Sequence, residues 1–90
     1  MRKVDNKILR KVSRIHDLCL EISNHDEEGK PKSFYCYNGI ANYLEVRVYA
    51  NGWREDIEPD KIFDGYICIK HVEKELDEMI AYLLELKEKK

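Results

Sequence analysis

Three histidines are the residues of this sequence best suited to metal binding or acid–base chemistry. His16 precedes Cys19 by three positions, His71 precedes Glu75 by four, and His25 begins an acidic run. Within a helix, the first two spacings can place two metal ligands on one face. Cys19, however, falls on an apolar helical stripe, and the sequence offers no second pair at a recognisable ligand spacing. We therefore expect neither a metal site nor another cofactor.

Covalent catalysis has little support in the sequence. It contains no glycine-rich phosphate loop, GxSxG elbow or HExxH motif. The serines Ser13, Ser23 and Ser33 lie outside any nucleophile context. A chain of 90 residues builds one thin core, which leaves no room for a pocket of the usual enzyme size. We expect a protein without enzymatic activity.

A row of basic residues follows one side of the first predicted helix. Lys3, Lys7, Arg10 and Arg14 recur at steps of four, three and four. Such a row can contact a phosphate backbone, which makes a nucleic-acid-binding module the alternative function. The net charge of −2 and the lack of an RNP-type sequence or zinc-finger spacing weigh against a nucleic-acid partner. A solvated row that forms ion pairs with acids of the last helix is the favoured interpretation.

Residues 42–53 contain the most regular alternation in the chain. One set of positions is apolar and the other is aromatic or charged: Leu44, Val46, Val48 and Ala50 against Tyr43, Glu45, Arg47 and Tyr49. This period of two predicts a strand with one buried face and one face that carries tyrosines. Those tyrosines have three interpretations: simple strand formers, a protein or self-association surface, or a platform for stacked bases.

The elements that position these residues follow from periodicity. Residues 4–23 and 71–88 predict amphipathic helices, and residues 33–37, 40–50 and 62–70 predict strands. The last strand, expected to turn Ile67 and Ile69 inward, has the start of the second helix as its alternative. The order predicts a single α+β domain over residues 1–90, a two-layer αβββα fold. Both helices should cover one face of a three-stranded antiparallel sheet and leave the other face open.

The register of the first hairpin decides which side chains lie on the open face. A two-residue turn at 38–39 would bury Tyr35 and Tyr37 beneath the helices. A three-residue loop would instead bury Phe34 and Cys36 and turn Tyr35 outward. We predict the second register, because it collects the purely apolar residues on one face.

The expected partner-binding surface joins the open face to the loop that contains the tryptophan. It consists of Tyr35, Tyr43, Arg47, Tyr49, Tyr66, Trp53, Glu55 and Asp56. Tyrosine and tryptophan are enriched at protein interfaces, and the acids beside Trp53 suit a basic partner. We expect a non-enzymatic protein-binding module that engages another protein or a second copy of itself.

Amino-acid composition indicates a folded domain and the cellular compartment in which the protein acts. Hydrophobic residues make up 43% of the chain and charged residues 38%, which indicates a folded domain. Cys19, Cys36 and Cys68 are odd in number and form no CxxC pair, so free thiols in a reducing compartment are expected. No apolar run approaches the length of a membrane span. We expect a cytoplasmic protein that does not associate with membranes.

In its general architecture the chain is similar to small accessory proteins of bacteriophages and mobile elements. The shared features are a short, charged αβββα chain without catalytic residues. The resemblance implies a role in binding a host protein and blocking or modulating it.

Overall fold

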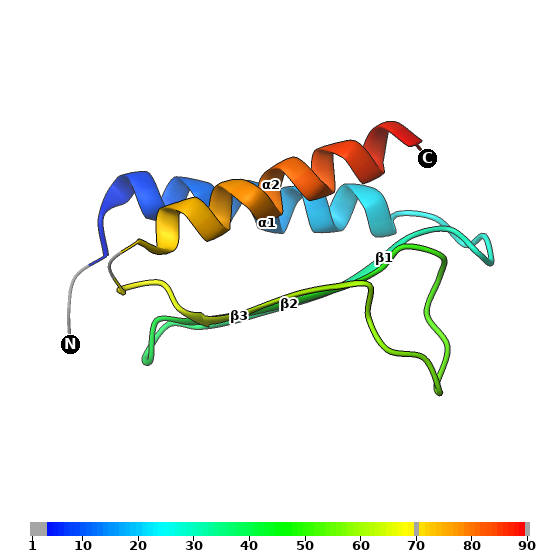
Figure 1. Ribbon diagram of the computed structural model, residues 1–90, viewed down its shortest axis with the longest axis horizontal. Coiled ribbons are helices and arrows are strands. Elements are labelled where there is room, and N and C mark those ends of the chain that lie inside the picture. Colours follow the sequence, from blue (N-terminus) through cyan, green and yellow to red (C-terminus); the bar gives the residue numbers. More distant parts are fainter. Residues whose placement is uncertain (1–3, 70, 90) are drawn as a thin grey trace.

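The computed structural model describes residues 4–69 and 71–89. Within these ranges the chain forms two helices and one three-stranded antiparallel sheet (Figure 1). The elements in chain order are α1 Asn6–Ser23, β1 Lys32–Asn38, β2 Tyr43–Tyr49, β3 Lys61–Tyr66 and α2 Val72–Lys89. The helices lie side by side in one layer, with α1 contacting β1 and α2 contacting β3. The predicted two-layer αβββα fold is confirmed.

Helix α1 is defined by its ends and by one apolar stripe. Asp5 caps the first turn, where its carboxylate accepts a hydrogen bond from the Lys7 main-chain N–H. At the other end the Lys32 ammonium donates to the main-chain oxygens of Ser23 (2.9 Å) and His25 (2.6 Å). A cation suits the negative end of the helix dipole. The buried stripe of the helix consists of Val12, Ile15, Leu18, Cys19 and Ile22.

Ion pairs show that the two helices run in the same direction. Lys7 pairs with Glu73 at 3.2 Å, near the beginning of both helices. Lys87 pairs with Glu21 at 2.6 Å, near both ends. Lys11 lies between them and binds Glu73 at 2.8 Å as well as Asp77.

The core lies between the helix layer and one face of the sheet. The strand order is β1-β2-β3, so β2 is the central strand. Its side chains Leu44, Val46 and Val48 are fully buried, as the period of two predicts. The helices add their apolar stripes to the same cluster, including Ile15 and Leu76.

The predicted hairpin register is wrong. Tyr35 pairs with Val46 and Tyr37 pairs with Leu44, so both tyrosines face the helices. Phe34 therefore points to the open face. The turn between the strands has four residues, Gly39–Asn42, and fits neither loop considered from the sequence.

Side-chain hydrogen bonds account for this turn. The Asn38 amide oxygen accepts from the main-chain N–H groups of Ile40 (3.0 Å) and Ala41 (3.1 Å). Asn42 adopts a left-handed backbone at φ 53°, which asparagine tolerates well. Its amide oxygen accepts from the Tyr37 hydroxyl at 3.1 Å, so this tyrosine covers the core while its polar tip keeps a partner.

The third strand is shorter than predicted. It occupies residues 61–66, which confirms a strand rather than the start of a helix. Ile67 is buried, as expected. Ile69 is 56% exposed, contrary to its predicted inward position, because the chain turns after Tyr66. Lys70, the last residue of the predicted strand, lies outside the described residues.

Candidate functional site

The open face of the sheet carries two aligned rows of aromatic and aliphatic side chains. Phe34, Arg47 and Ile62 are directly opposite one another across β1, β2 and β3. Tyr43 and Tyr66 are opposite one another nearer the hairpin turn. In the part of the chain that the structure describes, both helices lie on the other side of the sheet (Figure 1).

Large apolar groups are unusually exposed on this face. Phe34 is 50% exposed, Ile62 52% and Tyr66 49%. The ring centroids of Tyr43 and Tyr66 lie 5.2 Å apart in an edge-to-face arrangement. Aromatic pairs in this geometry stabilise one another, so these rings form a preorganised surface.

Arg47 is held in place by its neighbours on the sheet. Its guanidinium donates to the Glu45 carboxylate at 2.6 Å, and its central carbon lies 5.8 Å from the centre of the Phe34 ring. Burial and the nearby negative charges of Asp64 and Glu45 raise the pKa of Tyr43. The Tyr43 hydroxyl therefore remains a hydrogen-bond donor at neutral pH.

Two residues predicted for this surface are placed differently. Tyr35 lies beneath the helices, where its ring contacts His16 at 5.0 Å between centroids and packs against the core. Burial raises its pKa. Tyr49 occupies an open-face position, but only 8% of its surface is exposed. It lies at the end of β2 where residues 50–60 leave the sheet and return to it.

Hydrogen bonds close this return loop. The Asp60 carboxylate accepts from the main-chain N–H of Ala50 at 2.8 Å, and the Asp60 N–H donates to Val48 at 2.8 Å. Trp53, Glu55 and Asp56 occupy the part of the loop between these anchors and are exposed, as predicted.

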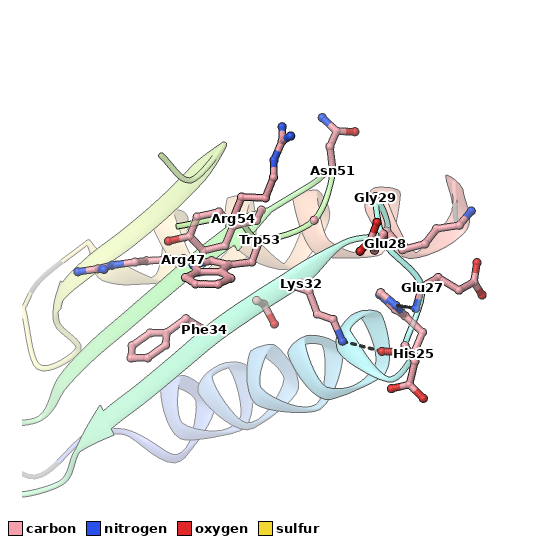
Figure 2. Close-up of a pocket in the computed structure, with 15 residues that line it drawn as sticks. His25, Glu27, Glu28, Gly29, Lys32, Phe34, Arg47, Asn51, Trp53 and Arg54 are labelled. Atoms are coloured by element: carbon pink, nitrogen blue, oxygen red, sulfur yellow. Dashed lines mark hydrogen bonds between the residues drawn. The ribbon is translucent and has the colours of Figure 1, made fainter. Parts of the chain in front are cut away.

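A hollow of about 1120 Å³ adjoins the open face beside this loop. Its floor comes from β1 and β2, and its walls are residues 25–30 and 51–54. Figure 2 shows Phe34, Arg47 and Trp53 on the sheet side and Glu28 on the opposite loop. The expectation that a thin core leaves no room for a pocket is wrong, because the hollow lies outside the core, between two loops.

Two glycines hold the walls of the hollow together. Gly29 (φ 79°) and Gly52 (φ 94°) both adopt backbone conformations that favour glycine. A Cβ atom on Gly52 would lie 3.1 Å from the Gly29 nitrogen and 3.4 Å from the Lys30 oxygen. The loops therefore pack main chain against main chain, which fixes their separation.

Sequence reasoning missed Phe34, Ile62 and the loop around Gly29. Phe34 was assigned to the core by the wrong register. Ile62 could have been found, because it shares the period of two with Tyr66, an outward residue. The approach of Gly29 to Gly52 has no local sequence signal, because it joins loops separated by a strand pair.

The basic row of α1 lies in the helix layer, away from the open sheet face. Lys7 is engaged by Glu73, which agrees with the predicted pairing to the last helix. Arg10 and Arg14 are exposed, and Lys3 lies outside the described residues. The row and the aromatic side chains therefore belong to different surfaces of the molecule.

Within residues 4–69 and 71–89, no three histidine, cysteine, aspartate or glutamate side chains come together as metal ligands. Neither described helix combines the length and apolar character that crossing a membrane requires. No protein-family model matches the chain, and comparisons with curated proteins and solved structures likewise give no significant match.

Proposed function

We propose that the protein is a non-enzymatic binding module that docks a partner protein on its open sheet face. The observation that carries the proposal is the cluster of exposed Phe34, Ile62 and Tyr66 with the half-buried Tyr43, beside the exposed Trp53. Apolar patches of this kind mark interaction sites in monomeric proteins. Aromatic side chains also contribute most of the binding energy where they become buried.

The open face alone is smaller than a stable interface, so the neighbouring loops should also belong to the binding surface. From strand spacing and rise, three strands of about six residues present roughly 300 Å². A stable interface needs about 800 Å² from each partner. The Trp53 loop and the hollow beside it extend the face toward that size.

Charge favours a protein over a nucleic acid. Lys7 of the basic row is engaged by Glu73 of α2, which also pairs with the neighbouring Lys11. The loop next to the open face carries the exposed acids Glu55 and Asp56, which would repel phosphates. The alternative, nucleic-acid binding through the row on α1, has only Arg10 and Arg14 as uncommitted support among the described residues.

The proposal extends to the setting of the interaction. As an accessory or inhibitor protein of the kind found in phages and mobile elements, it would act on a host protein in the cytoplasm. The free thiols Cys19, Cys36 and Cys68 suit such a reducing compartment.

A pair of matched double variants tests the proposal. Phe34→Ser with Ile62→Ser removes two exposed apolar groups from the open face. Leu20→Ser with Ile40→Ser removes two apolar groups that are at least as exposed, from α1 and the hairpin turn. Both variants should retain the fold, as checked by circular dichroism. Partners captured from the source cell by the wild type should be lost only in the first variant.

Sedimentation of the wild type and of the two double variants measures self-association. If the wild type is a dimer and only the open-face variant is monomeric, the partner is a second copy of this chain and not a different protein. The proposal fails if both variants keep every wild-type partner, or if both lose them equally. Binding of an RNA or DNA duplex that survives the open-face variant would favour the alternative function.

A further inference from the structure

We propose that the hollow between residues 25–30 and 51–54 is a groove for an extended basic segment of the partner protein. The inference rests on the proposed function and names the chemistry of the occupant. It assigns the segment an apolar side chain for the aromatic floor and lysine or arginine side chains for the acidic wall.

The shape of the hollow suits a chain segment. Its volume of about 1120 Å³ exceeds the ordinary range for small-molecule pockets, roughly 300–1,000 Å³. It is also continuous with the open face, because Phe34 and Arg47 belong to both. A partner seated on the sheet can therefore extend a segment into the hollow without a break in the interface.

Phe34 on the floor and Trp53 on one wall provide an apolar anchor point. Trp53 is 60% exposed and Phe34 about half exposed, and both line the hollow. Figure 2 shows both rings on the sheet side of the cavity. Tryptophan also offers the best ring face for an arginine or lysine, whose aliphatic stem can lie along it.

Two of the four bases that line the hollow are engaged within the protein. Lys32 donates to the main-chain oxygens of Ser23 and His25, and Arg47 is paired with Glu45. Lys30 and Arg54 are the remaining lining bases, and both are exposed.

The acids of the hollow have no such commitments. Asp26, Glu27 and Glu28 are exposed, and none forms an ion pair with another described residue. Glu55 and Asp56 add negative charge to the opposite loop. These five acids outnumber the three bases Lys30, Lys32 and Arg54, because hydrogen bonds to main-chain oxygens leave the charge of Lys32 in place. The loops around the hollow therefore carry a net negative charge, which complements a basic segment.

The acidic wall is held in shape by a histidine. The His25 ring bonds the main-chain oxygen of Pro31 at 2.6 Å through Nε2, and its Nδ1 accepts from the Glu27 N–H at 3.3 Å. The turn is tied to the other wall through Gly29 and Gly52. Carboxylates on a fixed loop lose less conformational freedom on binding than carboxylates on a loose one.

Trp53 is the single tryptophan of the chain, so its fluorescence reports directly on the groove. The probes are two short peptides without tryptophan. One has lysines spaced around a phenylalanine, and the other has the same sequence with glutamates in place of the lysines. The lysine peptide should change Trp53 emission saturably and bind more weakly as salt rises. The glutamate peptide should leave the emission unchanged.

Matched charge reversals locate the binding site. Glu27→Lys with Glu28→Lys should weaken the lysine peptide at least ~10-fold. Glu78→Lys with Glu88→Lys makes the same change in net charge on exposed positions of α2 and should have little effect. The inference is overturned by no saturable change in emission, by equal binding of the two peptides, or by equal weakening in both variants.

The peptide experiment and the partner-capture experiment together distinguish a failure of the groove assignment from a failure of the proposed function. Ile62 lies on the open face but does not line the hollow. If the lysine peptide does not change Trp53 emission saturably while partner capture still requires Ile62, only the assignment of the groove is wrong. If capture is also indifferent to Ile62 and Phe34, the proposed function falls with it.

Discussion

Leu44 and Phe34 lie on opposite faces of the same sheet, and truncation should distinguish them. Leu44 is fully buried beneath the helices, so Leu44→Ala should lower the free energy of unfolding by about 2–5 kcal/mol. Phe34 is half exposed on the open face, so Phe34→Ala should cost about 1 kcal/mol or less. Urea denaturation measures both. Comparable losses would mean that the face described as open is covered in the isolated protein.

The same two faces show how far single residues can be assigned from the sequence. Along β2 the period of two placed Leu44 and Tyr43 correctly, because its two faces differ in polarity. Along β1 both faces carry apolar or aromatic groups, so polarity could not separate Phe34 from Tyr35. The register was decided instead by the Asn38 side chain, which shapes a four-residue turn through hydrogen bonds that the residue pattern does not encode.

At the scale of elements, the parallel helices are joined by ion pairs whose stability depends on pH. Hydrogen bonds from Lys11 and then Lys7 lower the pKa of Glu73 from its ordinary value of 4.5. A carboxyl group with a lowered pKa in the folded state stabilises that state above its unfolded pKa. The stabilisation is lost as pH falls below about 4.5 through the lowered value.

Glu73→Gln should therefore flatten the acid limb of the stability curve. We expect the variant to have a lower Tm than the wild type at pH 7 and a smaller fall in Tm on acidification to about pH 3. Glu78→Gln, at an exposed position of α2, is the matched control and should follow the wild type. Parallel curves for the wild type and Glu73→Gln would show that the pairs with Lys7 and Lys11 do not form in solution.

The elements themselves were largely predictable, whereas the contacts between loops were not. The helices follow from steps of three and four, and β2 from strict alternation, because each needs one apolar face toward the core. The hollow depends on the approach of Gly29 to Gly52 across a strand pair, and the burial of Tyr49 depends on the path of residues 50–60. Neither is determined by local spacing.

The whole molecule divides into a layer that builds the core and a face that is available for binding. The helices and the buried face of the sheet account for the core cluster. The other face keeps Phe34, Ile62 and Tyr66 exposed and continues into the hollow beside Trp53. We propose that a partner protein covers this surface.

Cys36 offers the most direct measurement of that claim. It is exposed and lies in register with Glu45 and Asp64 on the open face, whereas Cys68 is half-buried against the core and Cys19 is buried. In the free protein Cys36 should react fastest with a thiol reagent, as read from its labelled peptide by mass spectrometry. In the isolated complex with the captured partner, the Cys36 rate should fall at least ~10-fold while the Cys68 rate stays the same. An unchanged Cys36 rate in the complex would contradict docking on the open face.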